Sequence, residues 1–327
     1  MNGKQGGKTE LRPSESPREV STPVLVYVVG HHKSGSTVLG ALLSGSPDIF
    51  FAGELYRFPS PIWVPGDPNR YCSCGAPSIN CPFWSHVRQE FERQHRLDEL
   101  RRGQLRFERW RDLPRTLFAR GSQRQELQRH AGRMEDLVRI IGQESGARVI
   151  VESGFGALRG RVYSVKRNPP FRVKFLHLVR DGRGFMWSES HQENTPEAGG
   201  PWVRFPPIVV ARWVGMNLLG TVLCSQDRAN YLRVRYEDLV ENPRATLERI
   251  GRFVGVDLTE VIARVEAKDP IPMRHITAGN RNRLGGSVVL KADLSWTTGL
   301  PQSSRALFWL TGGWLARLYG YRRRADA

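Results

Sequence analysis

The chain has 327 residues, of which 39% are hydrophobic, so it is long enough and apolar enough to form a sizeable core. Lys and Arg number 49 against 32 Asp and Glu, and the formal net charge of +17 favours nucleotides, anionic glycans, acidic peptides or anionic membrane surfaces as ligands, although basic proteins without such a partner are also common. No apolar segment follows Met1 and no run of ~18 to 20 apolar residues is apparent, which argues against a signal peptide and a membrane span and predicts a cytoplasmic protein.

The first 20 residues are polar and rich in Gly, Pro and Ser. A segment with so few large apolar side chains cannot offset the entropy lost on ordering, so residues 1–20 are predicted to be a disordered tail. The folded domain is predicted to span residues 21–324.

Residues 23–43 contain an apolar run, a turn rich in Gly, Ser and His, and a second apolar run with helical spacing. This pattern predicts a buried parallel strand, a loop at its carboxyl end, and a helix that begins near Ser36. Gly30 and Gly35 permit close approach of the backbone, and the helix would direct unpaired N–H groups into the loop. An anion such as phosphate is the expected ligand.

The loop differs from the nucleotide-triphosphatase motif G-x-x-x-x-G-K-[ST] at one decisive position. Gly30 and Gly35 have the correct spacing, but Ser36 occupies the position of the lysine, and Lys33 precedes the second glycine. Because that lysine serves the terminal phosphates, the loop disfavours a Mg²⁺-dependent kinase or ATPase.

Two further segments also predict a strand followed by a helix. Residues 175–190 again predict a strand, a polar turn and a helix, with Arg180 at the end of the strand and Ser188 eight positions later. Residues 235–243, RYEDLVENP, follow another short strand and precede an amphipathic helix that ends near residue 255.

Together these segments resemble sulfotransferases that use 3′-phosphoadenosine 5′-phosphosulfate (PAPS), of the bacterial type and with motifs similar to those of tyrosylprotein sulfotransferases. The resemblance covers residues 22–321. It implies a single α/β domain with a mostly parallel central sheet flanked by helices and a P-loop-like phosphate-binding loop. It also implies transfer of a sulfuryl group from PAPS to an acceptor hydroxyl or amine, on a carbohydrate, glycolipid or small molecule, without a metal.

The resemblance also implies roles for individual residues. Lys33 would neutralise the bridging oxygen as the phosphate leaves, and Arg180 and Ser188 would bind the 3′-phosphate. The remaining nucleotide contacts would come from the phosphate loop, the RYEDL segment and a segment that closes over PAPS: Ser34, Gly35, Ser36, Thr37, Tyr236, Gly279, Asn280, Arg281 and Arg283.

Glu54 follows a strand-like run at residues 49–52 and matches the catalytic base of glutamate-dependent sulfotransferases. A carboxylate within hydrogen-bond reach of the acceptor hydroxyl could accept its proton. The competing interpretation is an ion pair between Glu54 and Arg57. His31 and His32 are alternative bases.

Three of the four cysteines, Cys72, Cys74 and Cys81, lie close together in the sequence. With His86 they could form a Cys₃His zinc site, but Cys-x-Cys is not the usual zinc spacing. A structural role near the acceptor cleft is the favoured interpretation, and the redox state of the thiols is left open.

Residues 87–146 have helical periodicity interrupted by Gly and Pro, which predicts several helices. The charged run at 96–111 lacks the interleaved aromatic residues of a nucleic-acid site, so no nucleic-acid partner is expected. The next strand ends in Glu152-Ser153-Gly154-Phe155, where many relatives have Asp-Ser-Ser-Lys. Arg159 and Arg161 are the candidate substitutes for that lysine.

The aromatic residues Trp187, Trp202 and Phe205 could line an acceptor pocket or belong to the core. Near the C-terminus, a helical stripe predicts either a docked terminal helix or a membrane-binding surface, so peripheral membrane association is a further hypothesis: Leu307, Leu310, Trp314, Leu318 and Tyr321. Two functions outside the sulfotransferase class stay open, a P-loop kinase and a non-catalytic protein that binds nucleotide anions or glycans.

Overall fold

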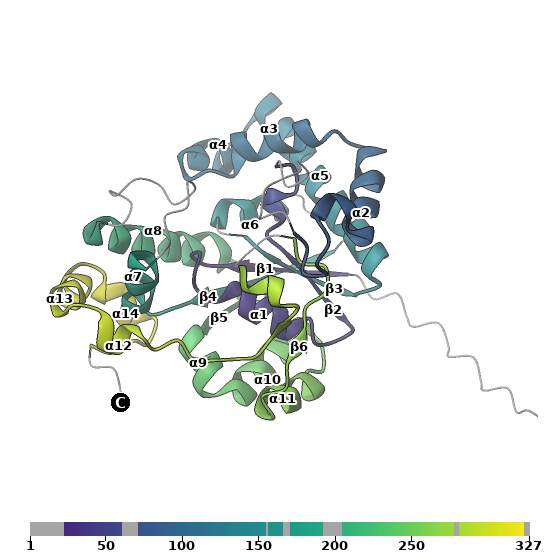
Figure 1. The fold of residues 1–327 in the computed structure, drawn as a ribbon. Coiled ribbons are helices and arrows are strands. Elements are labelled where there is room, and N and C mark those ends of the chain that lie inside the picture. Colours follow the sequence, from purple (N-terminus) through teal and green to yellow (C-terminus); the bar gives the residue numbers. More distant parts are fainter. Residues whose placement is uncertain are drawn as a thin grey trace, which may run out of the picture.

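A computed structural model describes residues 23–60, 71–154, 156–165, 171–191, 205–277 and 281–323 (Figure 1). The predicted tail at 1–20 lies outside the described residues, and so do Gly279 and Asn280 of the predicted closing segment. Phe155, Trp202 and the side chain of Arg281 are likewise outside the described part of the chain.

The centre of the fold is a five-stranded sheet in which every pairing is parallel. The strands, in the order β2-β3-β1-β4-β5 across the sheet, are β2 (Ile49–Gly53), β3 (Val149–Ser153), β1 (Val24–Val29), β4 (Arg172–Val179) and β5 (Tyr231–Arg235). This arrangement confirms the predicted α/β class.

The carboxyl ends of the parallel strands meet at one edge of the sheet. Gly30, Glu54, Arg180 and Tyr236 each directly follow a strand, so the fold brings the predicted site residues to this edge. After β1, the chain forms β2 and β3 on one side of β1 and then forms β4 and β5 on the other side. Such a switch of direction between neighbouring strands is where open α/β sheets form ligand-binding crevices.

One face of the sheet is covered by helices from the middle of the chain. Leu25, Tyr27 and Val29 of β1 belong to this core. The helices are α2 (Pro82–Glu92), α3 (Leu97–Phe107), α4 (Leu113–Leu117), α5 (Gly121–Ser145) and α6 (Ala157–Tyr163). The first four fall in the region where the interrupted helical periodicity predicts several helices.

The opposite face packs Val26 and Val28 of β1 against helices drawn below the sheet in Figure 1. They are α1 (Ser36–Leu43), α9 (Tyr236–Glu241), α10 (Pro243–Val254) and α11 (Thr259–Glu266). A short antiparallel pair, β6 (Ile271–Pro272) and β7 (Ser287–Val288), lies next to α1.

A third hydrophobic cluster lies at the β4 side of the sheet. Its helices are α7 (Gly182–Ser190), α8 (Pro206–Cys224), α12 (Trp296–Gly299), α13 (Gln302–Thr311) and α14 (Gly313–Leu318). By length and composition α8, with 19 residues, could cross a membrane, so the prediction that no run approaches such a span is wrong. Its Val209, Val210 and Trp213 are nevertheless buried against the third cluster.

The predicted C-terminal stripe also needs correction. The chain forms two helices that meet at Gly312, and their buried face contains Phe308, Trp309 and Leu315. Of the predicted stripe, Leu310 and Trp314 are 84% and 51% exposed, so these two side chains do not belong to the buried face.

Candidate active site

A cavity of about 880 Å³ opens at the carboxyl edge of the sheet. It is lined by the loop between β1 and α1, by α7, by Tyr236 and by residues 287–293. The predicted site residues that line it are Lys33, Gly35, Ser36, Thr37, Glu54, Arg180, Ser188, Tyr236 and Arg283.

The phosphate loop has the backbone conformation that its glycine predicts. Gly35 has φ +94°, and a Cβ atom there would lie 2.6 Å from Cδ2 of Tyr236. Only glycine meets both conditions, and α1 begins directly after it. Ser36 and Thr37 therefore present the amino end of α1 to the cavity.

Ser34 is the predicted residue of the phosphate loop that lies deepest in the structure. Its side chain is buried and is not among the residues that line the cavity. The Ser34 N–H donates a 3.2 Å hydrogen bond to the carbonyl of His31, within the loop itself. The Ser34 hydroxyl itself has no hydrogen-bond partner among the described residues, so its predicted contact with a phosphosulfate stays a prediction.

Lys33 extends from the loop to helix α7. Its Nζ donates a 2.5 Å hydrogen bond to the carbonyl of Ser188 and lies 3.5 Å from Oε1 of Glu189. The lysine thus joins the two segments that were predicted to bind opposite ends of the nucleotide.

Arg180 and Ser188 lie in contact at the start and near the end of this second segment. Nη1 of Arg180 donates a hydrogen bond of 3.1 Å to Oγ of Ser188 and another of 3.1 Å to the carbonyl of Lys33. The guanidinium also lies 5.0 Å from the ring centroid of Tyr236. These contacts fix the plane of the guanidinium at one end of the cavity.

The carboxylate that binds Arg180 was not predicted from the sequence. Nη2 of Arg180 lies 2.8 Å from Oδ2 of Asp293, a cavity residue in the segment after β7. Because Asp293 is about half exposed and the guanidinium is buried, the carboxylate occupies the open side of the arginine, where an anionic ligand would approach.

Glu189 is the second missed residue. This buried carboxylate lies 2.8 Å from Nε2 of His32 and 3.1 Å from Nη1 of Arg212, in addition to Lys33. Burial alone would raise the pKa of Glu189, but the hydrogen bond and charge of His32, with the charges of Lys33 and Arg212, lower it to about 2. Glu189 is therefore an anion that holds basic side chains at the rim of the cavity.

Glu54 is placed where it could act as a catalytic base, and it also forms the predicted ion pair with Arg57. It is 7% exposed and lines the cavity, and its Oε2 accepts a 3.0 Å hydrogen bond from Nε of Arg57. Burial raises the pKa of Glu54, against the opposing effect of the Arg57 charge. A raised pKa brings a carboxylate closer to the range in which it accepts a proton effectively near neutral pH.

The two histidines of the loop differ in access. His31 is 5% exposed and packs against Phe185, with ring centroids 4.1 Å apart, and burial lowers its pKa. His32 lines the cavity. Of the two alternative bases, only His32 is therefore in a position to contact an acceptor.

Arg159 and Arg161 do not substitute for the missing lysine. Arg159 is buried in ion pairs with Glu152 at 2.6 Å and Glu108 at 2.8 Å, and Arg161 Nη1 donates to the carbonyl of Ser164. Neither lines the large cavity, because both belong to α6 on the face of the sheet away from α1. Lys291 is an unpredicted lysine that does line it.

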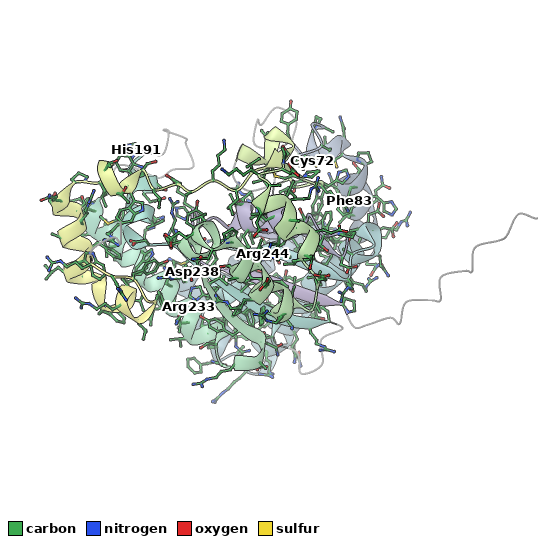
Figure 2. The ribbon with its side chains drawn as sticks, turned by 90° about the horizontal axis from the view of Figure 1, so that it is seen from below. Cys72, Phe83, His191, Arg233, Asp238 and Arg244 are labelled. Carbon is green, nitrogen blue, oxygen red and sulfur yellow. The ribbon has the colours of Figure 1, made fainter. Side chains whose placement is uncertain are left out.

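The prediction that His86 joins the three cysteines at a metal site is also wrong. Its Nε2 lies 3.3 Å from a carboxylate oxygen of Glu144, and the ring is about half exposed. The side chain that joins the three cysteines is His275 instead. Figure 2 shows Cys72 and Phe83 near each other on one side of the molecule and His191 on the other.

The cavity thus has a glycine loop and the amino end of a helix after the central strand, and an arginine–serine pair after the neighbouring strand, all groups suited to binding anions. Residues 172–260, from the first residue of β4 to the first turn of α11, match the model of the sulfotransferase family. The resemblance recognised from the motifs is confirmed for this segment, which is similar to the sulfotransferase family.

Solved structures similar to the chain are sulfotransferases as well. The sulfotransferase domain of the Synechococcus PCC 7002 olefin synthase is 17% identical with a TM-score of 0.49, and the alignment covers 95% of this chain and 99% of that one. Mouse sulfotransferase SULT7A1, in complex with PAP, is 14% identical with a TM-score of 0.49, covering 91% and 89%. No curated protein matches the chain.

Proposed function

We propose that the protein transfers the sulfuryl group of PAPS to an acceptor hydroxyl or amine. The observation that carries this proposal is the convergence of two anion-binding segments on one cavity, with Lys33 of the first in contact with Ser188 of the second. Two such segments match a nucleotide that has an anionic group at both the 5′ and the 3′ position. A nucleoside 5′-phosphate has no group for the second segment.

The 5′-phosphosulfate would lie against the backbone of the β1–α1 loop, with Ser36 and Thr37 at the amino end of α1. The 3′-phosphate would lie against Arg180 and Ser188, in the position that Asp293 approaches in the structure described here. Arginine suits this position because its planar fork binds phosphate through two N–H groups. Arg283, which is buried and lines the cavity, adds a cation to the closing segment.

Lys33 would act on the charge that develops during the reaction. As the bond between sulfur and the bridging oxygen breaks, negative charge grows on that oxygen, and a nearby ammonium group stabilises it more in the transition state than in the ground state. The contact between Lys33 and Glu189 holds the ammonium at the rim of the cavity before the nucleotide arrives.

Glu54 would accept the proton of the acceptor. The acceptor oxygen forms a bond to sulfur, the bond from sulfur to the phosphate oxygen breaks, and the acceptor proton moves to the carboxylate, leaving 3′,5′-diphosphoadenosine (PAP) as product. Arg57 would hold the carboxylate in one orientation. The buried position and raised pKa of Glu54 support this role over that of a surface ion pair.

The acceptor is proposed to be a carbohydrate, glycolipid or small molecule. The cavity of about 880 Å³ leaves room for a small acceptor or one sugar unit beside the nucleotide, and the ring of Trp187 at its wall packs on His191 with centroids 3.6 Å apart. Flat aromatic walls are suited to sugar rings and aromatic acceptors.

The direct test is incubation with PAPS labelled at sulfur and a panel of sugars, glycolipids, phenols and tyrosine peptides, without added metal. Label in an acceptor, with one PAP released for each label transferred, is expected for one class of the panel. PAP binding without transfer to any acceptor would favour a nucleotide-binding protein, and metal-dependent phosphate transfer from ATP would favour a kinase.

We further propose that the C-terminal helices contact anionic membranes. Leu310, Trp314 and Leu318 are 84%, 51% and 61% exposed, and Arg317 and Arg322 lie near them in the sequence. Exposed apolar side chains beside arginines are typical of interfacial binding. Sedimentation with phosphatidylserine vesicles, but not with neutral ones, is expected, and Leu310→Glu should reduce it. Equal sedimentation of both proteins would contradict the proposal.

A further inference from the structure

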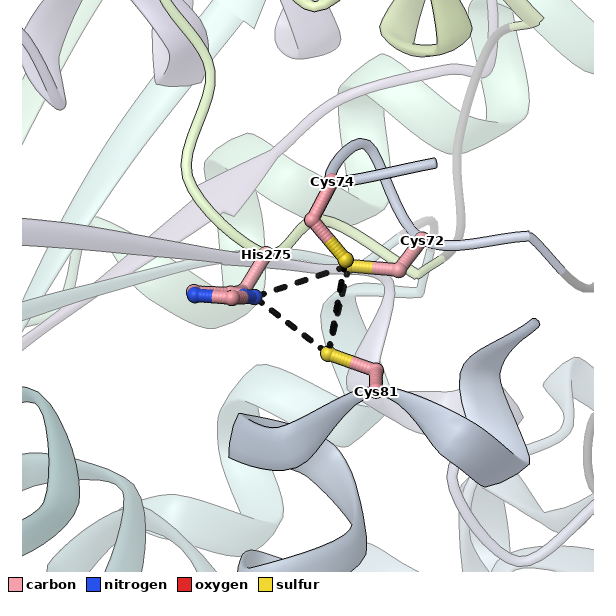
Figure 3. A group of neighbouring side chains, drawn as sticks. All are labelled: Cys72, Cys74, Cys81 and His275. Atoms are coloured by element: carbon pink, nitrogen blue, oxygen red, sulfur yellow. Dashed lines mark hydrogen bonds between the residues drawn. The ribbon is translucent and has the colours of Figure 1, made fainter. Parts of the chain in front are cut away.

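Four side chains that could bind a metal ion converge away from the nucleotide loops. Cys72, Cys74 and Cys81 come from the segment before α2, and His275 comes from the segment after β6 (Figure 3). The four candidate ligand atoms, three Sγ and Nδ1, all lie within 4.8 Å of one another. The segments are far apart in sequence, so the fold itself creates the cluster.

The spacing of the ligand atoms fits a tetrahedral metal. Sγ of Cys81 lies 3.6 Å from Sγ of Cys72 and 3.8 Å from Sγ of Cys74. Nδ1 of His275 lies 3.3 Å from Sγ of Cys81 and 3.9 Å from Sγ of Cys72. Bonds of about 2.3 Å to sulfur and 2.0–2.1 Å to nitrogen place tetrahedral ligands about 3.8 Å apart for two sulfurs and about 3.5 Å apart for sulfur and nitrogen.

A disulfide does not explain the cluster as well. All four cysteines of the chain are free thiols, and a disulfide between two of the clustered cysteines would leave the third thiol and the imidazole without a role. Three thiols and one imidazole form a closed set of four ligands, which is the composition of structural zinc sites.

His275 is held in an unusual conformation that directs its ring into the cluster. Its φ is 45°, in the left-handed region that costs energy for a residue other than glycine. The His275 carbonyl accepts a hydrogen bond from Nε1 of Trp84, and the ring stacks on Phe83 at 5.3 Å with an interplanar angle of 11°. Trp84 and Phe83 therefore hold the backbone and the ring of His275 in the orientation that points Nδ1 at the cysteines.

We propose that Cys72, Cys74, Cys81 and His275 bind a structural zinc ion. The cysteines would bind as thiolates, and their protons would be released to solvent as the metal enters. Cys74 is exposed, which gives the ion access to an otherwise buried set of ligands.

The zinc would join two segments that both border the active site. Ser73 and Ile276 already exchange hydrogen bonds, from Ser73 N–H to the Ile276 carbonyl and from Ile276 N–H to Ser73 Oγ, each 2.9 Å long. Met273, two residues before His275, lines the cavity, and so does Arg283, whose guanidinium donates to the carbonyl of Tyr71. The ion would thus fix the base of the segment that carries Arg283.

The test is the metal content of the full chain, purified without chelators and without a metal-binding tag. Elemental analysis should find about one zinc per chain in the wild type and in the control Cys224→Ser, which changes the buried free cysteine outside the cluster. The double variant Cys72→Ser/Cys81→Ser should lose the zinc. Cys74→Ser and His275→Ala should bind it more weakly, and Cys74→Ser keeps the proposal testable if the double variant fails to fold, because Cys74 is exposed.

Replacement of zinc by Co²⁺ gives a second readout. The wild type should show the visible absorption of tetrahedral cobalt and the near-ultraviolet band of thiolate-to-cobalt charge transfer, and Cys74→Ser should weaken the latter. Wild-type protein that binds no more zinc than the double variant after incubation with equimolar zinc would overturn the proposal. A protein mass that shows a disulfide among the three cysteines, or stoichiometric iron in place of zinc, would also overturn it.

Discussion

The guanidinium of Arg180 donates a 3.1 Å hydrogen bond to the hydroxyl of Ser188, from the end of strand β4 to a position near the end of helix α7. Both side chains line the cavity. If they bind a 3′-phosphate, Arg180→Ala should weaken PAP binding by ~1.5–3 kcal/mol, the range for a hydrogen bond to a charged group, and should leave 5′-AMP binding nearly unchanged. Calorimetry with both nucleotides measures the difference.

Arg244→Ala is the matched control for that experiment. Arg244 is an exposed arginine of α10 that pairs with Glu266, and it does not line the cavity. Wild-type protein that binds PAP and 5′-AMP equally would show that the pair does not bind a 3′-phosphate.

Asp293 should compete with the nucleotide for Arg180. The contact between its Oδ2 and Nη2 of Arg180, at 2.8 Å, must open when a phosphate binds. Asp293 is about half exposed, so water weakens the pair, and a contribution of ~0.5–1 kcal/mol predicts that Asp293→Asn tightens PAP binding about two- to five-fold. Asp257→Asn, at an exposed aspartate outside the cavity, should leave the PAP affinity unchanged. A weaker affinity in Asp293→Asn would mean that Asp293 orients Arg180 for the nucleotide.

Lys33→Ala should separate binding from chemistry. The lysine is expected to act on charge that grows as the sulfur–oxygen bond breaks, so kcat should fall ~10²–10³-fold while PAP affinity changes far less. Steady-state kinetics on the labelled-transfer reaction and calorimetry on the same variant give the two values. A raised KM with an unchanged kcat would place Lys33 among the residues that bind substrate and transition state equally.

Glu54→Gln removes the proton acceptor while an amide oxygen can still accept the hydrogen bond from Arg57. Turnover should fall ~10²–10⁴-fold, the usual contribution of a positioned base, with PAP binding near wild type. His32→Asn tests the alternative base, since His32 also lines the cavity. Should His32→Asn lose turnover while Glu54→Gln retains it, the base is His32 and Glu54 is an ion-pair partner.

Glu237 should make stability depend on pH. Its Oε2 accepts a 2.7 Å hydrogen bond from the Tyr321 hydroxyl, and its Oε1 accepts one of 3.0 Å from the Asp181 N–H. Burial, followed by the charge of Asp181, raises the pKa of Glu237 to about 7. The folded state therefore holds a proton that the unfolded state has lost, so this group's contribution is fully present below the unfolded pKa and is lost as pH rises through 7.

Glu237→Gln stays neutral at all pH values and should remove that loss. Relative to wild type, its free energy of unfolding should rise between pH 5 and pH 8 by about 1–3 kcal/mol, an amount reduced from the full shift because the side chain is partly accessible. Urea unfolding of both proteins at the two pH values measures the change. An identical pH dependence in both proteins would show that Glu237 does not titrate in this range.

The elements that could be predicted from the sequence are determined by residues that lie close together in the chain. The apolar run of β1 and the glycine of the phosphate loop lie within one strand–turn–helix unit, and the eight-residue spacing of Arg180 and Ser188 lies within a second. The parallel sheet then follows, because helical connections join the strands. The buried Ser34 shows the limit of such reasoning, since which side of a loop a hydroxyl faces depends on the backbone angles of its neighbours, including φ 64° at Lys33.

The residues that the sequence did not predict are long-range partners. Asp293 contacts Arg180 across 113 positions, and His275 contacts Cys81 across 194 positions. Neither lies in a motif, and only the folded chain brings them together. A buried arginine at the end of a strand does imply that an anion lies nearby, which is the one signal that could have led to Asp293.

The most direct test of the proposed activity compares two donors in one acceptor mixture, PAPS labelled at sulfur and ATP labelled at its terminal phosphate, without added metal. The site predicts that wild-type protein transfers the sulfur label and releases PAP, that Lys33→Ala transfers it far more slowly, and that the phosphate label stays on ATP. Transfer of the phosphate label on addition of Mg²⁺, or bound PAPS that is never consumed with any acceptor class, would contradict the account.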